Sequence, residues 1–124
     1  MTDELKVKQY FDDPALFLLQ YNKVSQLSEG ELRYAEIKLV LNSDVKFILL
    51  DEPFNGISPL SIEHVKVMIR ECAIHKGIIL TDHNYRNVLD VANRHYLLSD
   101  GGLKKVNDLE DLAFRRYIPN FARR

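Results

Sequence analysis

The feature that most constrains the fold is a run of four apolar residues ending in two acids, FILLDEP at 47–53. A short, unbroken apolar run of this kind is typical of a strand buried on both faces, as in a parallel sheet. Two similar runs follow at 78–80 and 96–98, and the intervals between them leave room for helices. We therefore expect an α/β fold with a mainly parallel sheet.

Helix signals occupy the intervals around these runs. Ser28 and Glu31 have the spacing of a capping box and predict a helix over 29–41. A second helix is expected to begin at Ser58-Pro59, and a short third one covers 84–92. Helical periodicity predicts that these helices bury Leu32, Ala35, Ile37 and Leu39, then Ile62, Val65, Met68, Ile69 and Cys72, then Val88, Leu89 and Ala92.

The two ends of the chain carry weaker signals. The turn at 100–102 (DGG) predicts a hairpin between 96–98 and 103–106. Asp13-Pro14 predicts a helix over 15–21. A second capping-box spacing at 107–110 predicts a last helix, which is followed by a basic and aromatic tail at 117–124.

Composition and charge exclude several classes of protein. The chain has 124 residues, which suits one domain, and 17 basic against 18 acidic residues give a net charge of −1. This balance does not indicate a nucleic-acid-binding surface. A single cysteine, Cys72, excludes an internal disulfide framework. No apolar run is long enough to span a bilayer, and the acidic start does not resemble a signal peptide, so we expect a cytoplasmic protein.

The paired acids Asp51 and Glu52 are the strongest candidates for chemistry. A strand that ends in two carboxylates places them at the carboxyl edge of the sheet, where open α/β folds bind ligands. In phosphoryl-transfer sites the first acid holds Mg²⁺, and the second polarises the attacking water. The alternative is a strand that simply runs into an acidic turn, and this motif alone leaves both interpretations open.

Four segments, in order, resemble the motifs of ABC-type ATPases. FILLDEP resembles the Walker B motif, and LSEGE at 27–31 resembles the signature Leu-Ser-Gly-Gly-Gln/Glu. NGISP at 55–59 takes the place of the D-loop, and TDHN at 81–84 is similar to the switch-histidine loop of lipopolysaccharide-exporter ATPases. The resemblance covers about 24–106. It implies the C-terminal half of an ABC nucleotide-binding domain, a partial P-loop NTPase fold with a C-terminal β-hairpin and the signature helix.

The resemblance implies ATP and Mg²⁺ as cofactors and assigns roles within the chain's own nucleotide site. Asp51 would hold the metal ion, Glu52 would be the catalytic base, and His83 would reach the γ-phosphate. Taken alone, a histidine at the end of a strand is more often structural.

The resemblance also implies a contribution to the nucleotide of a second subunit. Ser28, Gly30 and Glu31 of the signature, at a helix N-terminus, and Ser58 of the D-loop would face that subunit's ATP. The simpler interpretation of Ser28 is a helix cap, and both roles are compatible.

Three regions and two kinds of partner follow from the same resemblance. Residues 1–26 would end a helical subdomain, 27–106 would form the C-terminal half of the ATPase core, and 107–124 would form a C-terminal helix and tail. The expected partners are a second ABC ATPase subunit, identical or not, and membrane transport subunits. The chain would then lie in the cytoplasm, peripheral to the inner membrane.

The sequence lacks some of the family's motifs and alters others. No Gly-x-x-x-x-Gly-Lys-Ser/Thr loop occurs in the 124 residues, nor do the Gln loop and the adenine-stacking aromatic segment. Since that loop supplies most of the phosphate cradle, we expect the isolated chain to bind ATP weakly or not at all. Glu29 stands where the signature has its first glycine, and Ser58 stands where the D-loop has aspartate.

Two functions remain open on this basis. The chain is either part of an ABC transporter's ATP-binding subunit or a non-catalytic module that lends its signature and D-loop to a complete ATPase. A decayed gene product is a third and weaker idea.

In this fold class the Walker A strand lies between the strands expected at 78–80 and 96–98. Without that strand, we expect either a rearranged sheet or an oligomer.

Overall fold

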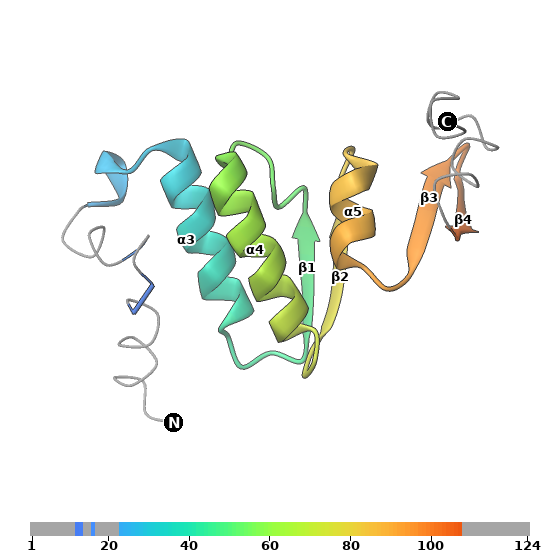
Figure 1. Cartoon of the computed structure of the whole chain (residues 1–124), viewed down its shortest axis with the longest axis horizontal. Helices are drawn as coiled ribbons and strands as arrows, with labels where there is room; N and C mark the ends of the chain where they lie inside the picture. Colours follow the sequence, from blue (N-terminus) through green and yellow to red (C-terminus); the bar gives the residue numbers. More distant parts are fainter. Residues whose placement is uncertain (1–11, 14–15, 17–22, 108–124) are drawn as a thin grey trace. The chain divides into compact units, whose positions relative to one another are not determined.

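The computed structural model describes residues 12–13, 16 and 23–107, which fall into two compact units, Met1–His83 and Asn84–Arg124. The elements of the first unit are η2 (Val24–Gln26), α3 (Glu29–Leu41), β1 (Phe47–Asp51), α4 (Pro59–Cys72) and β2 (Gly77–Thr81) (Figure 1). Those of the second unit are α5 (Tyr85–Val91), β3 (His95–Ser99) and β4 (Gly102–Val106). The expected α/β fold, with parallel pairing and a C-terminal hairpin, is confirmed.

The first unit is built on the parallel pair β1 and β2. Their register places Phe47 opposite Gly77 and Asp51 opposite Thr81. One further hydrogen bond, from the Glu52 amide to the Thr81 carbonyl at 2.9 Å, extends the pairing past the end of β1. The last residues of both strands therefore meet at the same edge.

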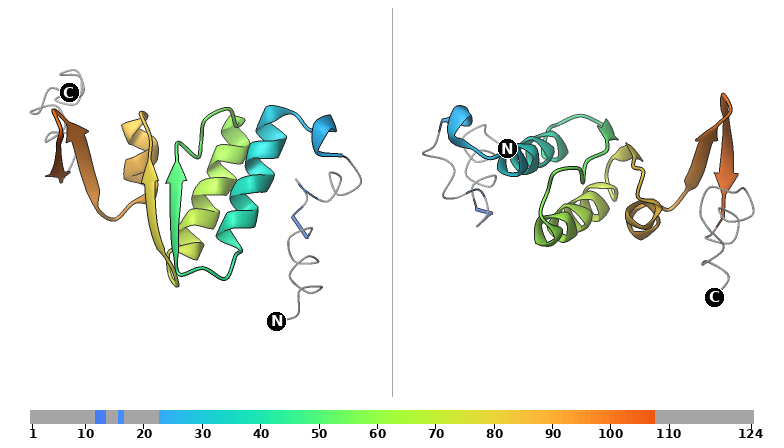
Figure 2. Two further views of the ribbon diagram at one scale, coloured as in Figure 1. Left: turned by 180° about the vertical axis from the view of Figure 1, so that it is seen from behind. Right: turned by 90° about the horizontal axis from the view of Figure 1, so that it is seen from above.

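One face of this pair is covered by α3 and α4, as Figure 2 shows from behind and from above. Alternate side chains of β1, and side chains at helical spacing on α3 and α4, fill the layer between the sheet and the helices. The buried apolar residues of these elements are Ile48 and Leu50, then Tyr34, Ile37 and Leu41, then Val65 and Ile69.

The inward face of α3 differs from the predicted one. Ile37 is buried as expected, but Leu39 is exposed, and Tyr34 and Leu41 take core positions instead. The buried face of α3 thus includes Tyr34. Its hydroxyl has a hydrogen-bond partner, because it donates to the Asp13 carboxylate at 2.6 Å. Of the other residues expected inward, Val65 and Ile69 are buried, whereas Leu32, Ala35, Ile62, Met68 and Cys72 are only half-buried.

The other face of the strand pair carries bare apolar side chains. Phe47 is 79% exposed, Leu49 76% and Ile79 67%, while Ile48 and Leu50 between them are buried. The expectation that β1 and β2 are buried on both faces is therefore wrong for this structure. The reason is that α3 and α4 lie on one side only, and no described helix of this unit covers the other.

The second unit contains a short helix and a hairpin. Asn84 caps α5 by accepting a hydrogen bond from the Arg86 amide at 3.1 Å. β3 and β4 pair antiparallel, and the turn between them has positive φ at Asp100 (50°) and Gly101 (73°). These are the torsions of a two-residue hairpin turn, as the Asp-Gly-Gly sequence predicted. Val88, Leu89 and Ala92 are half-buried rather than core residues.

The sheet has not rearranged in the described part of the chain. β2 pairs with β1 and β3 pairs with β4, so the strands are divided between two separate two-stranded sheets. The expected oligomer stays a prediction. The helix predicted over 15–21 lies outside the described residues apart from Leu16, and the last helix and tail beyond 107 lie outside them too. Among the described residues, no helix has the length and apolar character to cross a membrane.

Because the core lies between one face of the strand pair and the helices, substitutions on the two sides of α4 should differ in their effect on stability. Val65→Ala removes two methyl groups from a fully buried position and should lower the free energy of unfolding by about 2 kcal/mol. Val67→Ala, the same change at an exposed position of the same helix, should cost less than about 0.5 kcal/mol. Urea denaturation measures both, and equal losses would contradict the assigned core.

Candidate functional site

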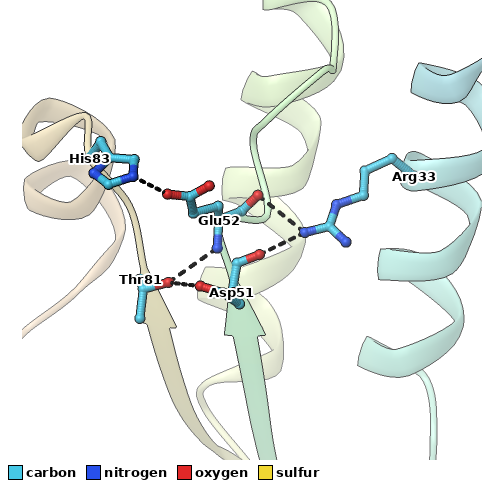
Figure 3. A network of polar contacts seen from close by, with 5 residues as sticks. All are labelled: Arg33, Asp51, Glu52, Thr81 and His83. Carbon is cyan, nitrogen blue, oxygen red and sulfur yellow. Dashed lines mark hydrogen bonds and ion pairs between the residues drawn. The ribbon is translucent and has the colours of Figure 1, made fainter.

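The carboxyl ends of β1 and β2 bring four polar side chains together (Figure 3). The Thr81 hydroxyl donates to Asp51 Oδ1 at 2.5 Å. The Glu52 amide is 2.9 Å from the Thr81 carbonyl oxygen and 3.2 Å from Thr81 Oγ1. His83 Nε2 lies 2.5 Å from Glu52 Oε1. Asp51, Glu52 and His83, which the sequence singled out, thus form one contiguous site.

The backbone of Glu52 is in an unusual conformation. Its φ of 47° lies in the left-handed region, which costs free energy for a residue with a Cβ. Contacts on both sides hold it there. Its amide is bound at the end of β2, and its carbonyl accepts the Asn55 amide at 3.2 Å. Pro53 and Phe54, which follow directly, are buried and anchor the turn.

The site is open to solvent. The His83 side chain is 91% exposed and that of Glu52 34% exposed, and Asp51 is exposed as well. The contact between His83 and Glu52 is therefore screened by water and adds little to the stability of the fold. Its consequence is geometric, because it holds a carboxylate and an imidazole at a position that a ligand can reach.

A fifth residue, Arg33 of α3, was missed by sequence reasoning. Its Nη2 donates to the carbonyl oxygens of Asp51 at 2.7 Å and Glu52 at 3.1 Å (Figure 3). An arginine on a helix surface is ordinarily solvated, so its residue type alone gave no signal. A pocket of about 340 Å³ opens beside this contact, lined by Glu29, Arg33, Asp51, Glu52, Asn55 and Gly56.

The N-terminus of α3 has the predicted capping box. The Ser28 hydroxyl accepts from the Glu31 amide at 3.1 Å, and the Ser28 amide donates to Glu31 Oε1 at 3.0 Å. The first turn carries two carboxylates, those of Glu29 and Glu31. These charges suit the positive end of the helix dipole but oppose the approach of an anion.

Gly30 is packed against the turn that follows β1. A Cβ at this position would lie 2.9 Å from the carbonyl oxygen of Gly56, closer than real side chains come. Gly56 itself has φ of 76°, a conformation that glycine adopts without strain. The start of α3 and the 55–59 turn therefore require glycine at their point of contact.

Ser58 caps the next helix, α4. Its Oγ accepts from the Ser61 amide at 3.3 Å and donates to Ser61 Oγ at 3.1 Å. Ser28 and Ser58 are both exposed, each at a helix N-terminus. Their roles as helix caps are observed, and their roles toward a nucleotide stay predictions.

A larger hollow of about 700 Å³ lies along α3 and α4, away from the paired carboxylates. Asp13 and Lys38 line it and form an ion pair at 3.1 Å, and Tyr34 bonds the same carboxylate. These contacts tie the segment before α3 to the helix itself. They engage three of the polar residues that line this hollow, Asp13, Tyr34 and Lys38.

The donor atoms at the strand ends fit Mg²⁺ only in part. Carboxylate oxygens are suitable ligands, and Mg²⁺ in phosphoryl-transfer sites takes one or two of them plus phosphate oxygens and water. Within residues 12–13, 16 and 23–107, no group of three or more His, Cys, Asp or Glu side chains is arranged to hold a metal. The carboxylates would therefore share an ion with phosphate oxygens rather than enclose it.

Comparison with known proteins relates this chain to ATP-binding proteins of ABC transporters. No family model matches the chain. The lipopolysaccharide export system ATP-binding protein LptB of Acidithiobacillus ferridurans is 40% identical over 107 residues, which are 86% of this chain and 44% of that protein. LptB of Escherichia coli (strain K12) is 45% identical over 80 residues, which are 62% of this chain and 32% of that protein. The chain thus spans less than half the length of these curated relatives.

Solved structures show the same fold. A nucleotide-free ATP-binding cassette from an ABC transporter superposes with a TM-score of 0.66 at 21% identity, over 96% of this chain and 49% of that one. An ATP-binding cassette in its ADP conformation gives a TM-score of 0.64 at 22% identity, over 99% of this chain and 50% of that one. The described fold therefore corresponds to about half of such a cassette.

The capping box predicts a pH dependence. The hydrogen bond from the Ser28 amide, and then that from its hydroxyl, hold the pKa of the Glu31 carboxyl below its usual value of 4.5. A lowered pKa means that folding favours the ionised form. The cap's contribution is therefore present above pH 4.5 and is lost as the pH falls through the lowered value.

Carboxyl ¹³C NMR titration checks this directly. We expect Glu31 to titrate below pH 4.5 and Ser28→Ala to raise its midpoint partway, since the backbone donor remains. Ser58→Ala, which removes the cap of α4 instead, is the matched control and should leave Glu31 unchanged. A Glu31 midpoint that does not respond to Ser28→Ala would contradict the capping box.

Proposed function

Because this chain is homologous to part of the ATP-binding proteins of ABC transporters, we propose that it is the portion of such a subunit that carries the catalytic carboxylates. The observation that carries the proposal is the contiguous arrangement of Asp51, Glu52, Thr81 and His83 at the joint end of two parallel strands. That edge is where α/β folds bind phosphorylated ligands.

The residues divide the chemistry of ATP hydrolysis among them. MgATP, when bound, supplies the phosphoryl group and the charge of the metal ion. Asp51 would offer a carboxylate oxygen to that ion, and the Thr81 hydroxyl orients this carboxylate by donating to its Oδ1 at 2.5 Å. Glu52 accepts a proton from the attacking water, and His83 orients Glu52 through the contact at Oε1.

The bare face of β1 and β2 supports the view that the chain works as part of a larger domain. Parallel strands are almost always covered on both faces, and a two-stranded sheet is marginal by itself. Phe47, Leu49 and Ile79 are exposed there, and Leu49 lies opposite Ile79 in the strand register. The relatives are about twice as long, and this chain matches about half of a solved cassette. The remaining half, which would bring the phosphate-binding loop, covers this face.

The partners of such a subunit follow from the same assignment. A second ATP-binding subunit completes each nucleotide site, and membrane subunits couple hydrolysis to transport at the inner face of the membrane. The named relatives belong to lipopolysaccharide export. We extend to this chain the role of an ATP-binding component of an exporter, and the transported substrate is determined by the membrane subunits.

The proposal is tested by completing the chain with the P-loop-bearing segment of an LptB relative, fused or co-expressed. Calorimetry should show no MgATP binding tighter than about millimolar for the chain alone and micromolar binding after completion. Glu52→Gln should lower kcat of the completed protein by about 10²–10⁴-fold with ATP binding retained. Glu71→Gln, at an exposed position of α4, should leave kcat unchanged.

Two results would contradict this function. One is a completed wild-type protein that binds no ATP. The other is a Glu52→Gln variant that hydrolyses ATP as fast as the wild type.

A second candidate function is supported by the start of α3. The capped N-terminus of this helix and the turn at Gly56 are in contact within this unit, and neither needs the phosphate-binding loop. As a non-catalytic module, the chain would offer these two elements to the ATP of a complete partner subunit. Glu29 opposes this role, because its carboxylate lies at the helix end that would face phosphate.

Replacing that residue separates the two functions. If the chain acts as a module, Glu29→Gly should raise the ATPase rate of a complete LptB-type partner mixed with it by roughly tenfold, the effect of removing one opposed charge. Glu36→Gly, on an exposed position of the same helix, is the control for lost helix propensity. A partner rate that neither the chain nor Glu29→Gly changes would exclude the module.

A further inference from the structure

The contact between Arg33 and the end of β1 joins two elements that the sequence separates by 18 and 19 positions. A single guanidinium nitrogen, Nη2, donates to two consecutive carbonyl oxygens, those of Asp51 and Glu52. Hydrogen bonds from a charged donor are shorter and stronger than neutral ones, and the 2.7 Å bond to Asp51 is of this kind.

These two carbonyls belong to the residues whose side chains form the candidate site. Glu52 is strained, with φ of 47°, and such a conformation persists only where several contacts determine it. β2 holds its amide through Thr81, and Arg33 holds its carbonyl from the opposite side. Figure 3 shows this arrangement, with Thr81 and Arg33 on either side of the Glu52 backbone.

We propose that Arg33 is a positioning residue, which fixes the direction of the Glu52 carboxylate by holding the backbone of the Asp51–Glu52 turn from α3. Arg33 touches neither Glu52 Oε1 nor His83 in the contacts described, so it acts on the carboxylate through the main chain. The role rests on the proposed function, in which Glu52 is the proton acceptor.

The contact of Arg33 also links the capped N-terminus of α3 to the Asp51–Glu52 turn. Ser28 caps α3 five residues before Arg33, about 7.5 Å along the helix axis. Gly30, between them, is packed against the turn at Gly56. A displacement of the N-terminus of α3 therefore moves the donor that holds Glu52.

The first test uses the ¹⁵N-labelled chain and does not depend on ATP hydrolysis. Arg33→Met should shift the amide signals of Glu52 and Thr81 and the side-chain signals of His83. Arg33→Lys, which keeps the charge without the guanidinium, should recover part of the wild-type pattern. Arg70→Met, at an exposed arginine in the last turn of α4, should leave these signals in place.

The second test uses the completed ATPase and separates positioning from binding. Arg33→Met should lower kcat about tenfold and change KM for MgATP less than about threefold, because Glu52 is misdirected while the phosphate contacts remain. Arg33→Lys should restore part of kcat. A helix-surface role would instead leave kcat at the wild-type value.

The outcomes distinguish this proposal from the one on which it rests. Shifts confined to α3, with Glu52, Thr81 and His83 unmoved in Arg33→Met, would overturn the positioning role whatever the ATPase does. If Arg33→Met does not fold, the signals of Glu52, Thr81 and His83 in Arg33→Lys decide whether Arg33 has the positioning role. A completed wild type without ATPase activity would overturn the proposed function alone, because the spectra still report whether Arg33 holds the turn.

Discussion

The register of β1 against β2 is the constraint on which the candidate site depends. Pairing Asp51 with Thr81 leaves Glu52 one residue past the ladder and His83 two residues past it, at the same edge. A slip of one residue would turn every side chain of one strand to the opposite face. It would then separate the Thr81 hydroxyl from Asp51 and the imidazole from Glu52. The buried alternation of Ile48 and Leu50 fixes which face of β1 packs against the helices, so packing on that face constrains the geometry of the polar edge.

The turn after β1 is where local strain and distant contacts meet. Glu52 adopts a left-handed backbone that its own side chain disfavours, and three elements compensate: β2 at its amide, α3 at its carbonyl and the buried Pro53 and Phe54 behind it. Strain concentrated at a candidate catalytic residue is typical of functional sites. The arrangement also explains why the start of α3 lies so close, since Gly30 allows the helix to approach the Gly56 carbonyl.

Much of this could be read from the sequence, because it rests on local rules. The strand run, the capping box at Ser28 and the Asp-Gly turn of the hairpin each depend on neighbouring residues, and each is confirmed. The position of Asp51 and Glu52 at the edge of the sheet followed from the strand pattern, whereas His83 was singled out by its resemblance to the switch-histidine loop. Arg33 could not be found this way, since its acceptors are main-chain carbonyls that every residue possesses. The inward position of Tyr34 was missed because its hydroxyl is satisfied only by the distant Asp13.

The prediction that failed is the burial of β1 and β2 on both faces. An apolar run predicts burial in whatever assembly the protein uses, whereas these residues are exposed in the chain described. Under the proposed function, a second layer from the part of a cassette that this chain does not match would cover these residues. On that proposal, Asp51, Glu52 and His83 would form half of a phosphate-binding site, and other residues would contribute the phosphate cradle.

A crystal structure of the chain completed by a P-loop-bearing segment, with Mg²⁺ and a non-hydrolysable ATP analogue, tests this account most directly. We expect an Asp51 oxygen to lie about 2.1 Å from the metal ion or one water away from it, with Glu52 and His83 facing the terminal phosphate. A nucleotide bound elsewhere, with Asp51 and Glu52 turned away from its phosphates, would contradict the central claim.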